Sequence, residues 1–209
     1  MEAVIFDLDG VVVDTEKHWN RAEKEIYREA TGSEVDPDRL AGMSITNTYE
    51  KLCEDFDVEV SREEFFEMYE SRAEEVYCEK AELMEGLKEF IQELRDLGLL
   101  IGLATGSYWP GYVIDRFDLD FDAVVDSGDV DGKGKPEPET YRMAVESLGV
   151  DPEDAVAVDD TEAGVASAKG AGLYCIGYSE SGGDAPSNAD EVVDSPKLLR
   201  ERVFEIVGR

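Results

Sequence analysis

The N-terminal stretch constrains the fold of this chain more than any other part. Ala3–Phe6 is an apolar run of strand-forming residues, so it predicts a β-strand buried on both faces. Asp7 and Asp9 follow it directly. If the extended geometry continues through Leu8, both carboxylates point into the same small volume. Such a pair of anions is tolerated where a divalent cation or a shared proton compensates it. Gly10 then permits a sharp turn.

Taken alone, Asp-Leu-Asp-Gly is equally compatible with an ordinary turn, because Asp and Gly are common turn residues. Three further polar segments favour a functional site, because each follows an apolar strand-like run. In α/β folds the crevice beyond the carboxyl ends of parallel strands binds ligands. The three segments are Thr105-Gly106-Ser107 after Leu99–Ala104, residues 132–138 after Asp122–Val125, and Asp159-Asp160-Thr161 after Ala155–Val158.

In this order, the four segments resemble the motifs of the haloacid dehalogenase superfamily. The resemblance covers essentially the full length and points to the branch with a helical cap, which contains phosphoglycolate phosphatase and β-phosphoglucomutase-like enzymes. It implies an α/β fold with a doubly wound, Rossmann-like parallel sheet as the core and an inserted all-α helical-bundle cap. The expected division is a discontinuous core of residues 1–14 and 84–209, with the cap at residues 15–83.

The resemblance also implies roles for individual residues. Asp7 matches the nucleophile, since a carboxylate is ionised at neutral pH and forms an acyl phosphate that water can attack. Asp9 matches the general acid and base. Thr105 matches the hydroxyl that holds a phosphoryl oxygen, and the backbone amides of the following turn, from Gly106 onward, can assist it.

The resemblance leaves two choices open, for the lysine and for the metal ligands. Lys135 matches the cation that offsets charge on the transferring group, and its Lys-Pro-Glu-Pro setting favours it over Lys133. Oxygen ligands together with waters suit Mg²⁺, the cofactor that the family implies. An Asp-Asp-Thr segment after a strand is also a common helix N-cap, and both roles can coexist. The expected magnesium ligands are Asp7, Asp9 through its backbone carbonyl, and Asp160, with Asp159 as the second choice.

The segment between the first two motifs predicts helices at residues 15–31, 44–56 and 61–80, because apolar residues recur there three and four positions apart. Ser61 and Glu64 predict a capping box. We assign the aromatic residues of these helices to the core of a bundle rather than to a cofactor site. For His18, the only histidine, we favour a surface or packing role, because the proposed chemistry needs no imidazole. The candidate specificity residues of this segment are His18, Trp19, Met43, Ser44 and Ile45.

Two departures from the family pattern bear on the substrate. Ile45, in a loop at residues 40–45 that resembles the family's specificity loop, stands where the related sugar-phosphate mutases carry a phosphate-binding arginine. Residues 108–110 (Tyr-Trp-Pro) stand where those mutases tend to carry polar, often basic residues. We therefore favour a phosphatase acting on a small phosphorylated metabolite, of the phosphoglycolate or sugar-phosphate type, and keep a β-phosphoglucomutase-like mutase as the alternative.

Two other activities fit less well. Haloacid dehalogenation is disfavoured, because enzymes with that activity lack the acid that Asp9 provides. A receiver domain, a phospho-accepting binding module, also places acids, a hydroxyl and a lysine at strand ends. A receiver domain, however, lacks a helical insertion of this size. Its acid pair comes first and its phosphoacceptor is internal, whereas here Asp7 and Asp9 open the chain and a second acid pair, Asp159 and Asp160, follows the lysine.

The charge of the chain restricts its partners. The formal net charge is −31, with 51 Asp and Glu against 20 Lys and Arg. This field disfavours nucleic acid binding, and the dispersed acids suggest a protein that works in concentrated salt. The alternative is an acidic mesophilic protein.

No apolar leader or membrane-length run is present. The three cysteines, Cys53, Cys78 and Cys175, lack metal-ligand spacing, so we expect reduced, structural thiols and a cytoplasmic monomer or weak homodimer without membrane partners.

Overall fold

The computed structural model describes residues 1–40, 43–130, 134–179 and 186–208. Within these residues, six parallel strands form one sheet in the order β5-β4-β1-β6-β7-β8. Strand β1 pairs with β4 on one side and with β6 on the other, so the carboxyl ends of these three strands are adjacent. The strands are β1 (Ala3–Phe6), β4 (Leu100–Ala104), β5 (Ala123–Val125), β6 (Ala155–Asp159), β7 (Tyr174–Tyr178) and β8 (Glu191–Val193).

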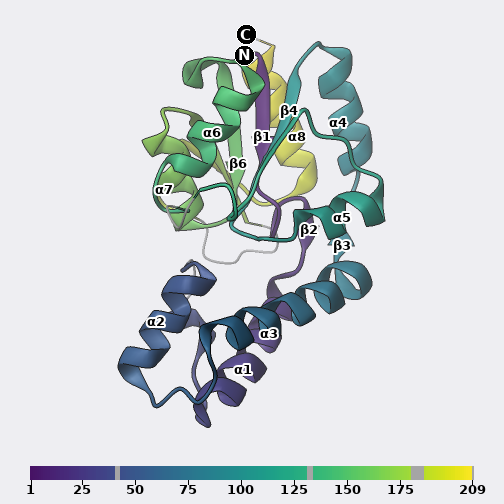
Figure 1. Cartoon of the computed structure of the whole chain (residues 1–209). Coiled ribbons are helices and arrows are strands. Elements are labelled where there is room, and N and C mark those ends of the chain that lie inside the picture. Colours follow the sequence, from purple (N-terminus) through teal and green to yellow (C-terminus); the bar gives the residue numbers. More distant parts are fainter. Residues whose placement is uncertain (41–42, 131–133, 180–185, 209) are drawn as a thin grey trace.

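Helices cover both faces of the sheet (Figure 1). Helices α4 (Leu87–Asp96), α5 (Pro110–Phe117) and α8 (Pro196–Val207) share a hydrophobic cluster with Val4 and Phe6. Helices α6 (Glu139–Leu148) and α7 (Glu162–Gly170) share a second cluster with Ala3 and Ile5. Side chains of β1 alternate between the two clusters, as a strand buried on both faces requires. The doubly wound α/β core is therefore confirmed.

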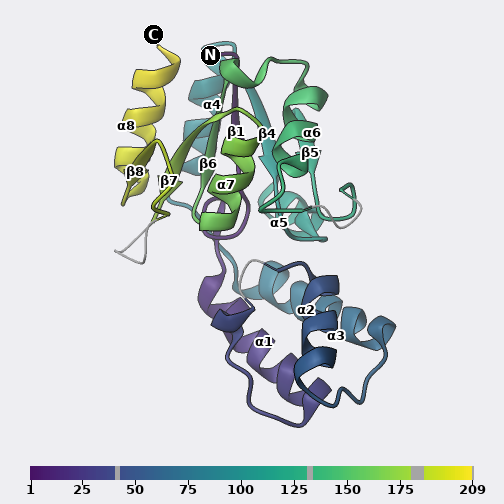
Figure 2. The same cartoon turned by 90° about the vertical axis from the view of Figure 1, so that its left-hand side faces the viewer.

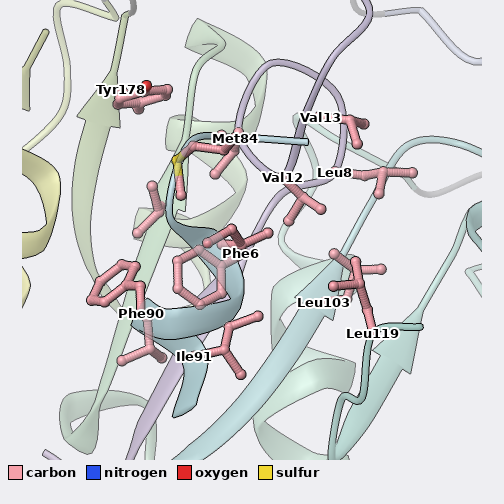
Figure 3. Packing of buried hydrophobic residues seen from close by; sticks show 14 of the residues in the cluster. Phe6, Leu8, Val12, Val13, Met84, Phe90, Ile91, Leu103, Leu119 and Tyr178 are labelled. Atoms are coloured by element: carbon pink, nitrogen blue, oxygen red, sulfur yellow. The ribbon is translucent and has the colours of Figure 1, made fainter. Parts of the chain in front are cut away.

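The packing around β1 is dense on the α4 side (Figure 3). The rings of Phe6 and Phe90 meet edge to face with centroids 5.9 Å apart. Val12 and Met84, which lie where the chain leaves and re-enters the core, belong to the same cluster. Burial of apolar side chains such as these is the main favourable free-energy contribution to folding. The connection to the helical segment is thus part of the core packing.

Three helices lie beyond the carboxyl end of the sheet (Figures 1 and 2). They are α1 (Glu16–Thr31), α2 (Ile45–Asp55) and α3 (Arg62–Glu75), with a short 3₁₀ turn at Pro37–Arg39. Their shared cluster includes Ile26, Leu52 and Phe65. The capping box of Ser61 and Glu64 is present at the start of α3.

A short antiparallel pair of strands, β2 (Val13–Asp14) and β3 (Glu82–Leu83), links this bundle to the core. Both predicted boundaries, after residue 14 and after residue 83, fall at this pair. The division into a core and a cap remains our proposal. In the described residues, no helix is both long and apolar enough to cross a membrane.

The structure differs from the sequence-based expectations at several points. The helix expected to end at Lys80 changes to a π-helix at Val76–Lys80, and the Ala81 amide donates to the Val76 carbonyl. Helix α5, strand β8 and the β2–β3 pair were not expected. All three cysteines are free, and Cys175 is buried. Cys53 and Cys78 are exposed, so burial supports a structural role for Cys175 alone.

Candidate functional site

Lys135 lies at the centre of the site and bridges two carboxylates. It comes from the connection between β5 and α6, and the peptide bond to Pro136 is cis. Its Nζ donates to Asp7 Oδ1 at 2.5 Å and to Asp159 Oδ2 at 2.6 Å. Because Asp7 follows β1 and Asp159 ends β6, the lysine joins the ends of two neighbouring strands. All three side chains are at least nine-tenths buried.

Burial and the neighbouring charges shift the pKa values of Asp7 and Lys135. The pKa of Asp7 is raised to about 7: burial is the largest cause, Lys135 opposes it, and the charges of Asp159 and Asp9 add to the rise. The two carboxylates that Lys135 contacts raise the pKa of its ammonium well above the ordinary range, against the effect of burial. The lysine therefore stays positively charged at any working pH.

Asp159 has protein donors on both of its oxygens. Besides Lys135, the Tyr141 hydroxyl donates to Oδ2 at 2.7 Å, while the amide and hydroxyl of Thr161 donate to Oδ1. Gly164 packs against this carboxylate so closely that a Cβ there would lie 2.0 Å from its oxygens. These contacts make Asp159 a group that positions Lys135. They disfavour it as a metal ligand.

Asp160 has a different environment, although it is the next residue. Its Oδ1 is buried and has no hydrogen-bond partner among the described residues. Gly10, at φ 83°, lies against it, and a Cβ at Gly10 would stand 1.9 Å from Oδ2. Burial raises the pKa of Asp160 well above its ordinary value, and the charges of Asp7 and Asp159 add to this. A buried carboxylate beside a second one, without a donor, fits a cation site.

No group of three or more His, Cys, Asp and Glu side chains in the described ranges could by itself hold a metal ion. The expected magnesium site needs fewer side chains, because two carboxylates, one backbone carbonyl and waters complete its shell. Asp7 and Asp160 supply the carboxylates in this arrangement. The oxygen-only donor set fits Mg²⁺.

Asp9 faces the connection to the helical bundle. Strand β1 ends at Phe6, and the Leu8 carbonyl accepts from two later amides, so the strand does not continue through Leu8 as assumed. Asp9 nevertheless lies close enough to Asp7 for its charge to raise the pKa of Asp7. The Asp9 carboxylate accepts from Thr15 Oγ1 at 2.5 Å, Trp19 Nε1 at 3.2 Å and the Tyr77 hydroxyl at 2.8 Å. Burial raises the pKa of Asp9, and these three donors oppose the rise.

Tyr77 also connects Asp9 to the loop after β4. Its hydroxyl lies 3.0 Å from Ser107 Oγ. Since a phenol has one proton, Tyr77 donates to Asp9 and accepts from Ser107. The Ser107 amide in turn donates to Thr105 Oγ1 at 3.0 Å, and Ser127 Oγ donates to the Gly106 carbonyl. This network fixes the loop that carries the expected phosphate-binding hydroxyl.

A cavity of about 350 Å³ lies over these groups, between the sheet and the helical bundle. It brings together all of the predicted catalytic, phosphate-binding and metal residues other than Asp159. Of the predicted specificity residues, His18 does not line the cavity, whereas the other four do. Lys133, the alternative lysine, and residues 41–42 of the specificity loop are outside the described residues. The predicted residues lining the cavity are Asp7, Asp9, Trp19, Met43, Ser44, Ile45, Thr105, Gly106, Lys135 and Asp160.

Sequence reasoning missed several residues of this cavity and its support. Tyr77 and Tyr69 were assigned to the bundle core alone, yet both line the cavity. Glu23 lines it as well, from α1. For Glu23, the only available signal was its spacing of four and seven residues from Trp19 and Glu16, which places the three on one helix face.

Several known proteins resemble this chain in sequence and in fold. A family model described as haloacid dehalogenase-like hydrolase matches residues 1–172. The phosphorylated carbohydrates phosphatase of Thermotoga maritima is 32% identical over 202 residues, which are 92% of this chain and 93% of the relative. The β-phosphoglucomutase of Bacillus subtilis is also 32% identical, over 206 residues, 92% of this chain and 89% of the relative. The crystal structure of CbbY from Rhodobacter sphaeroides in complex with phosphate is 26% identical, has a TM-score of 0.79 and covers 93% of this chain and 94% of that one.

Proposed function

We infer the function from one premise: the chain belongs to the haloacid dehalogenase-like hydrolases. Relatives named as phosphatases support a phosphatase. We propose that it hydrolyses a small phosphorylated metabolite of the sugar-phosphate or phosphoglycolate type, with Mg²⁺ as cofactor and through an aspartyl-phosphate. The observation that carries the proposal is Lys135 held between Asp7 and Asp159, beside the buried oxygen of Asp160 that has no partner among the described residues.

The proposed reaction has two steps. In the first, a carboxylate oxygen of Asp7 attacks phosphorus, the bond to the leaving oxygen breaks, and Asp9 gives its proton to that oxygen. In the second, water attacks the phosphorus of the acyl phosphate, Asp9 takes a proton from the water, and the carboxylate of Asp7 is released. Thr105 and Lys135 bind the phosphoryl oxygens during both steps.

The magnesium ligands in this proposal are the carboxylates of Asp7 and Asp160 and the backbone carbonyl of Asp9. When bound, Mg²⁺ offsets the negative charge of the phosphoryl group and of the carboxylates around it. Two further residues support this arrangement. Asp159 keeps Lys135 in place, and Gly10 leaves room for the Asp160 carboxylate.

The phosphomutase alternative is comparably supported by the relatives. A mutase that works through a bisphosphate must hold a second phosphate, and a cation is the usual partner for that group. Ile45 lines the cavity, as do Tyr108 and Trp109. Lys135 is the one Lys or Arg among the described lining residues, and two carboxylates already contact it. The lack of a further cation in the described lining favours phosphatase activity over phosphomutase activity.

The net charge and the free thiols support proposals about the salt concentration and the cellular compartment in which the enzyme works. The net charge of −31 favours work in concentrated salt, where screening reduces the repulsion among the acids. The free cysteines fit a reducing compartment such as the cytoplasm. We expect a monomer or weak homodimer.

Asp9→Asn tests the covalent mechanism with p-nitrophenyl phosphate. The leaving group of this substrate departs without a proton, so Asp7 is still phosphorylated in the variant, whereas hydrolysis lacks its base. We expect a burst close to one equivalent of p-nitrophenol per active enzyme, a slow steady state, and phosphate on Asp7. Asp7→Asn should give neither burst nor turnover. Full turnover after chelation of magnesium, or an Asp9→Asn enzyme with neither a burst nor labelled Asp7, would contradict the proposal.

A further inference from the structure

Five aromatic side chains of the described residues line the cavity, and they come from both sides of it. Trp19, Tyr69 and Tyr77 belong to the helical bundle and the π-helix that follows it, whereas Tyr108 and Trp109 belong to the loop after β4. The two tryptophans pack against both the bundle cluster and the cluster shared by α4, α5 and α8. Rings therefore surround the space between the sheet and the bundle.

The polar atoms of three of these rings have protein partners. Trp19 Nε1 donates to Asp9 Oδ1 at 3.2 Å, and the Tyr77 hydroxyl donates to Asp9 Oδ2 at 2.8 Å. The Tyr69 hydroxyl donates to Glu23 Oε1 at 3.2 Å. These bonds use the single N–H or O–H proton of each ring. The surface that the three rings contribute to the cavity is therefore mainly carbon.

Contacts with other rings hold these side chains in place. Trp19 stacks on Tyr69 with centroids 6.1 Å apart. Tyr108 and Trp109 both contact Phe66 of α3, with centroid distances of 5.1 Å and 5.3 Å. A ring surface that is already ordered binds a planar group at a lower entropy cost than flexible side chains do.

The composition of the rest of the wall also suits a planar apolar group. Pro37, Met43 and Ile45 line the cavity beside the rings. A hydroxyl group enclosed by carbon loses its hydrogen bonds to water, which costs free energy, whereas an aromatic ring loses none and gains stacked or edge-to-face contacts. Three of the four polar bundle residues in the lining lie on α1, so a polar substituent is matched mainly where α1 lies. These four residues are Glu16, Asn20, Glu23 and Ser44.

We propose that the cavity accepts an aromatic ring joined to the phosphoester oxygen through a single carbon, which adds arylmethyl phosphates to the substrates of the enzyme. The inference rests on the proposed phosphatase function, in which Asp9 reaches the ester oxygen to protonate it. Trp19 and Tyr77 contact the same carboxylate, so a ring one carbon away from that oxygen lies near both. Hydrolysis breaks the P–O bond to the arylmethanol oxygen, which takes the proton of Asp9, and water then releases phosphate from Asp7.

Two phosphonates that cannot be hydrolysed test ring recognition without turnover. In 2-phenylethylphosphonate and 2-cyclohexylethylphosphonate, a methylene group replaces the ester oxygen of benzyl phosphate and cyclohexylmethyl phosphate. The pair differs only in the planarity and π-electrons of the ring. In titration calorimetry with excess Mg²⁺, the wild-type protein should bind the phenyl compound about 2- to 12-fold more tightly, the range expected for one aromatic pair. In turnover assays, kcat/KM for benzyl phosphate should be at least equal to that for glucose 6-phosphate.

Tyr108→Leu and Trp109→Leu each remove one ring and keep an apolar side chain. The ratio of the two Kd values should fall toward one in both variants. The ratio is measured on a single preparation, so partial misfolding of a variant does not change it. Tyr112→Leu is the matched control, because Tyr112 lies on α5, is half-buried and does not line the cavity. It should leave the ratio and the rate with p-nitrophenyl phosphate unchanged.

The outcomes separate this inference from the proposed function. A wild-type protein that prefers the phenyl compound and hydrolyses neither p-nitrophenyl phosphate nor benzyl phosphate would retain the ring site and lose the phosphatase proposal. An enzyme that hydrolyses p-nitrophenyl phosphate and binds the cyclohexyl compound equally well or better, or binds neither phosphonate, overturns the inference. A Kd ratio that is unchanged in both Tyr108→Leu and Trp109→Leu, or a kcat/KM for benzyl phosphate below that for glucose 6-phosphate, overturns it as well.

Discussion

Asp159 and Asp160 are adjacent acids, and we predict that their amide variants change stability in opposite directions. Asp159 accepts hydrogen bonds from Lys135, Tyr141 and Thr161, whereas Asp160 Oδ1 has no partner among the described residues. Each of Asp159→Asn and Asp160→Asn removes one negative charge and keeps the side-chain shape. The pair therefore separates the effect of local contacts from the effect of net charge.

The expected magnitudes follow from these contacts. Removing one partner of a buried ion pair costs about 3–5 kcal/mol. In Asp159→Asn the new carboxamide still accepts hydrogen bonds and Lys135 keeps Asp7, so we take about 3 kcal/mol, which for a protein of this size lowers Tm by roughly 6 to 12 °C. Asp160→Asn removes a buried charge that has no donor and that Asp7 repels. Without metal, it should stabilise by about 1–3 kcal/mol and raise Tm by roughly 2 to 12 °C.

The assay is thermal unfolding in EDTA and then in excess Mg²⁺. A ligand that binds only the folded state stabilises it, by about 2.7 kcal/mol at one hundred times its Kd. Mg²⁺ should raise the Tm of the wild-type protein and of Asp159→Asn, and much less that of Asp160→Asn. Equal losses of Tm in the two variants in EDTA, or an undiminished response of Asp160→Asn to Mg²⁺, would refute this reasoning.

Two further predictions concern pH and salt. The pKa of Asp7 is raised from 3.8 to about 7 in the folded protein, mainly by burial, so between these values the folded state binds a proton that the unfolded state has lost. Stability in EDTA should therefore fall as pH rises through this window, and Tm should fall less steeply in Asp7→Asn. Equal slopes of Tm against pH in the two proteins would contradict the assignment. With 51 acids against 20 bases, screening should relieve more repulsion than it weakens attractive pairs, so Tm should rise from dilute buffer to molar KCl or NaCl. A Tm that is flat or falls over that range would argue against adaptation to salt.

The sequence predicted the elements that carry the site because two strong local signals coincide there. An apolar run of strand length is followed by charged or hydroxyl residues, as at Phe6–Asp7 and Val158–Asp159, and this marks both the strand and its carboxyl end. Helix α5 was missed, although Pro110 at its first position is a helix-start signal, because Pro-Gly also marks turns. Strand β8 has three residues, of which only two are apolar, so no apolar run of strand length marks it.

Side-chain partners could not be predicted from the sequence. Tyr77 belongs to an apolar stripe with helical spacing, and nothing local distinguishes its hydroxyl, which contacts Asp9 from 68 positions away. The different environments of Asp159 and Asp160 depend on Lys135, Tyr141 and Gly10, which tertiary folding brings to β6. Sequence reasoning therefore located the acids, and only the family resemblance ranked Asp160 ahead of Asp159 as a metal ligand.

The position of β1 in the middle of the sheet also determines when the site can form. Ala3 pairs with Leu100 on one side and with Ala155 on the other. By contrast, the bundle cluster that contains Ile26, Leu52 and Phe65 draws its buried residues from a single continuous stretch of chain. Closing long loops costs entropy before the strand contacts compensate for it, so β1 acquires its neighbours late in folding. On a ribosome, β1, which leads into the proposed nucleophile Asp7, emerges before β4 and β6, so it has no complete sheet to join until β6 has followed.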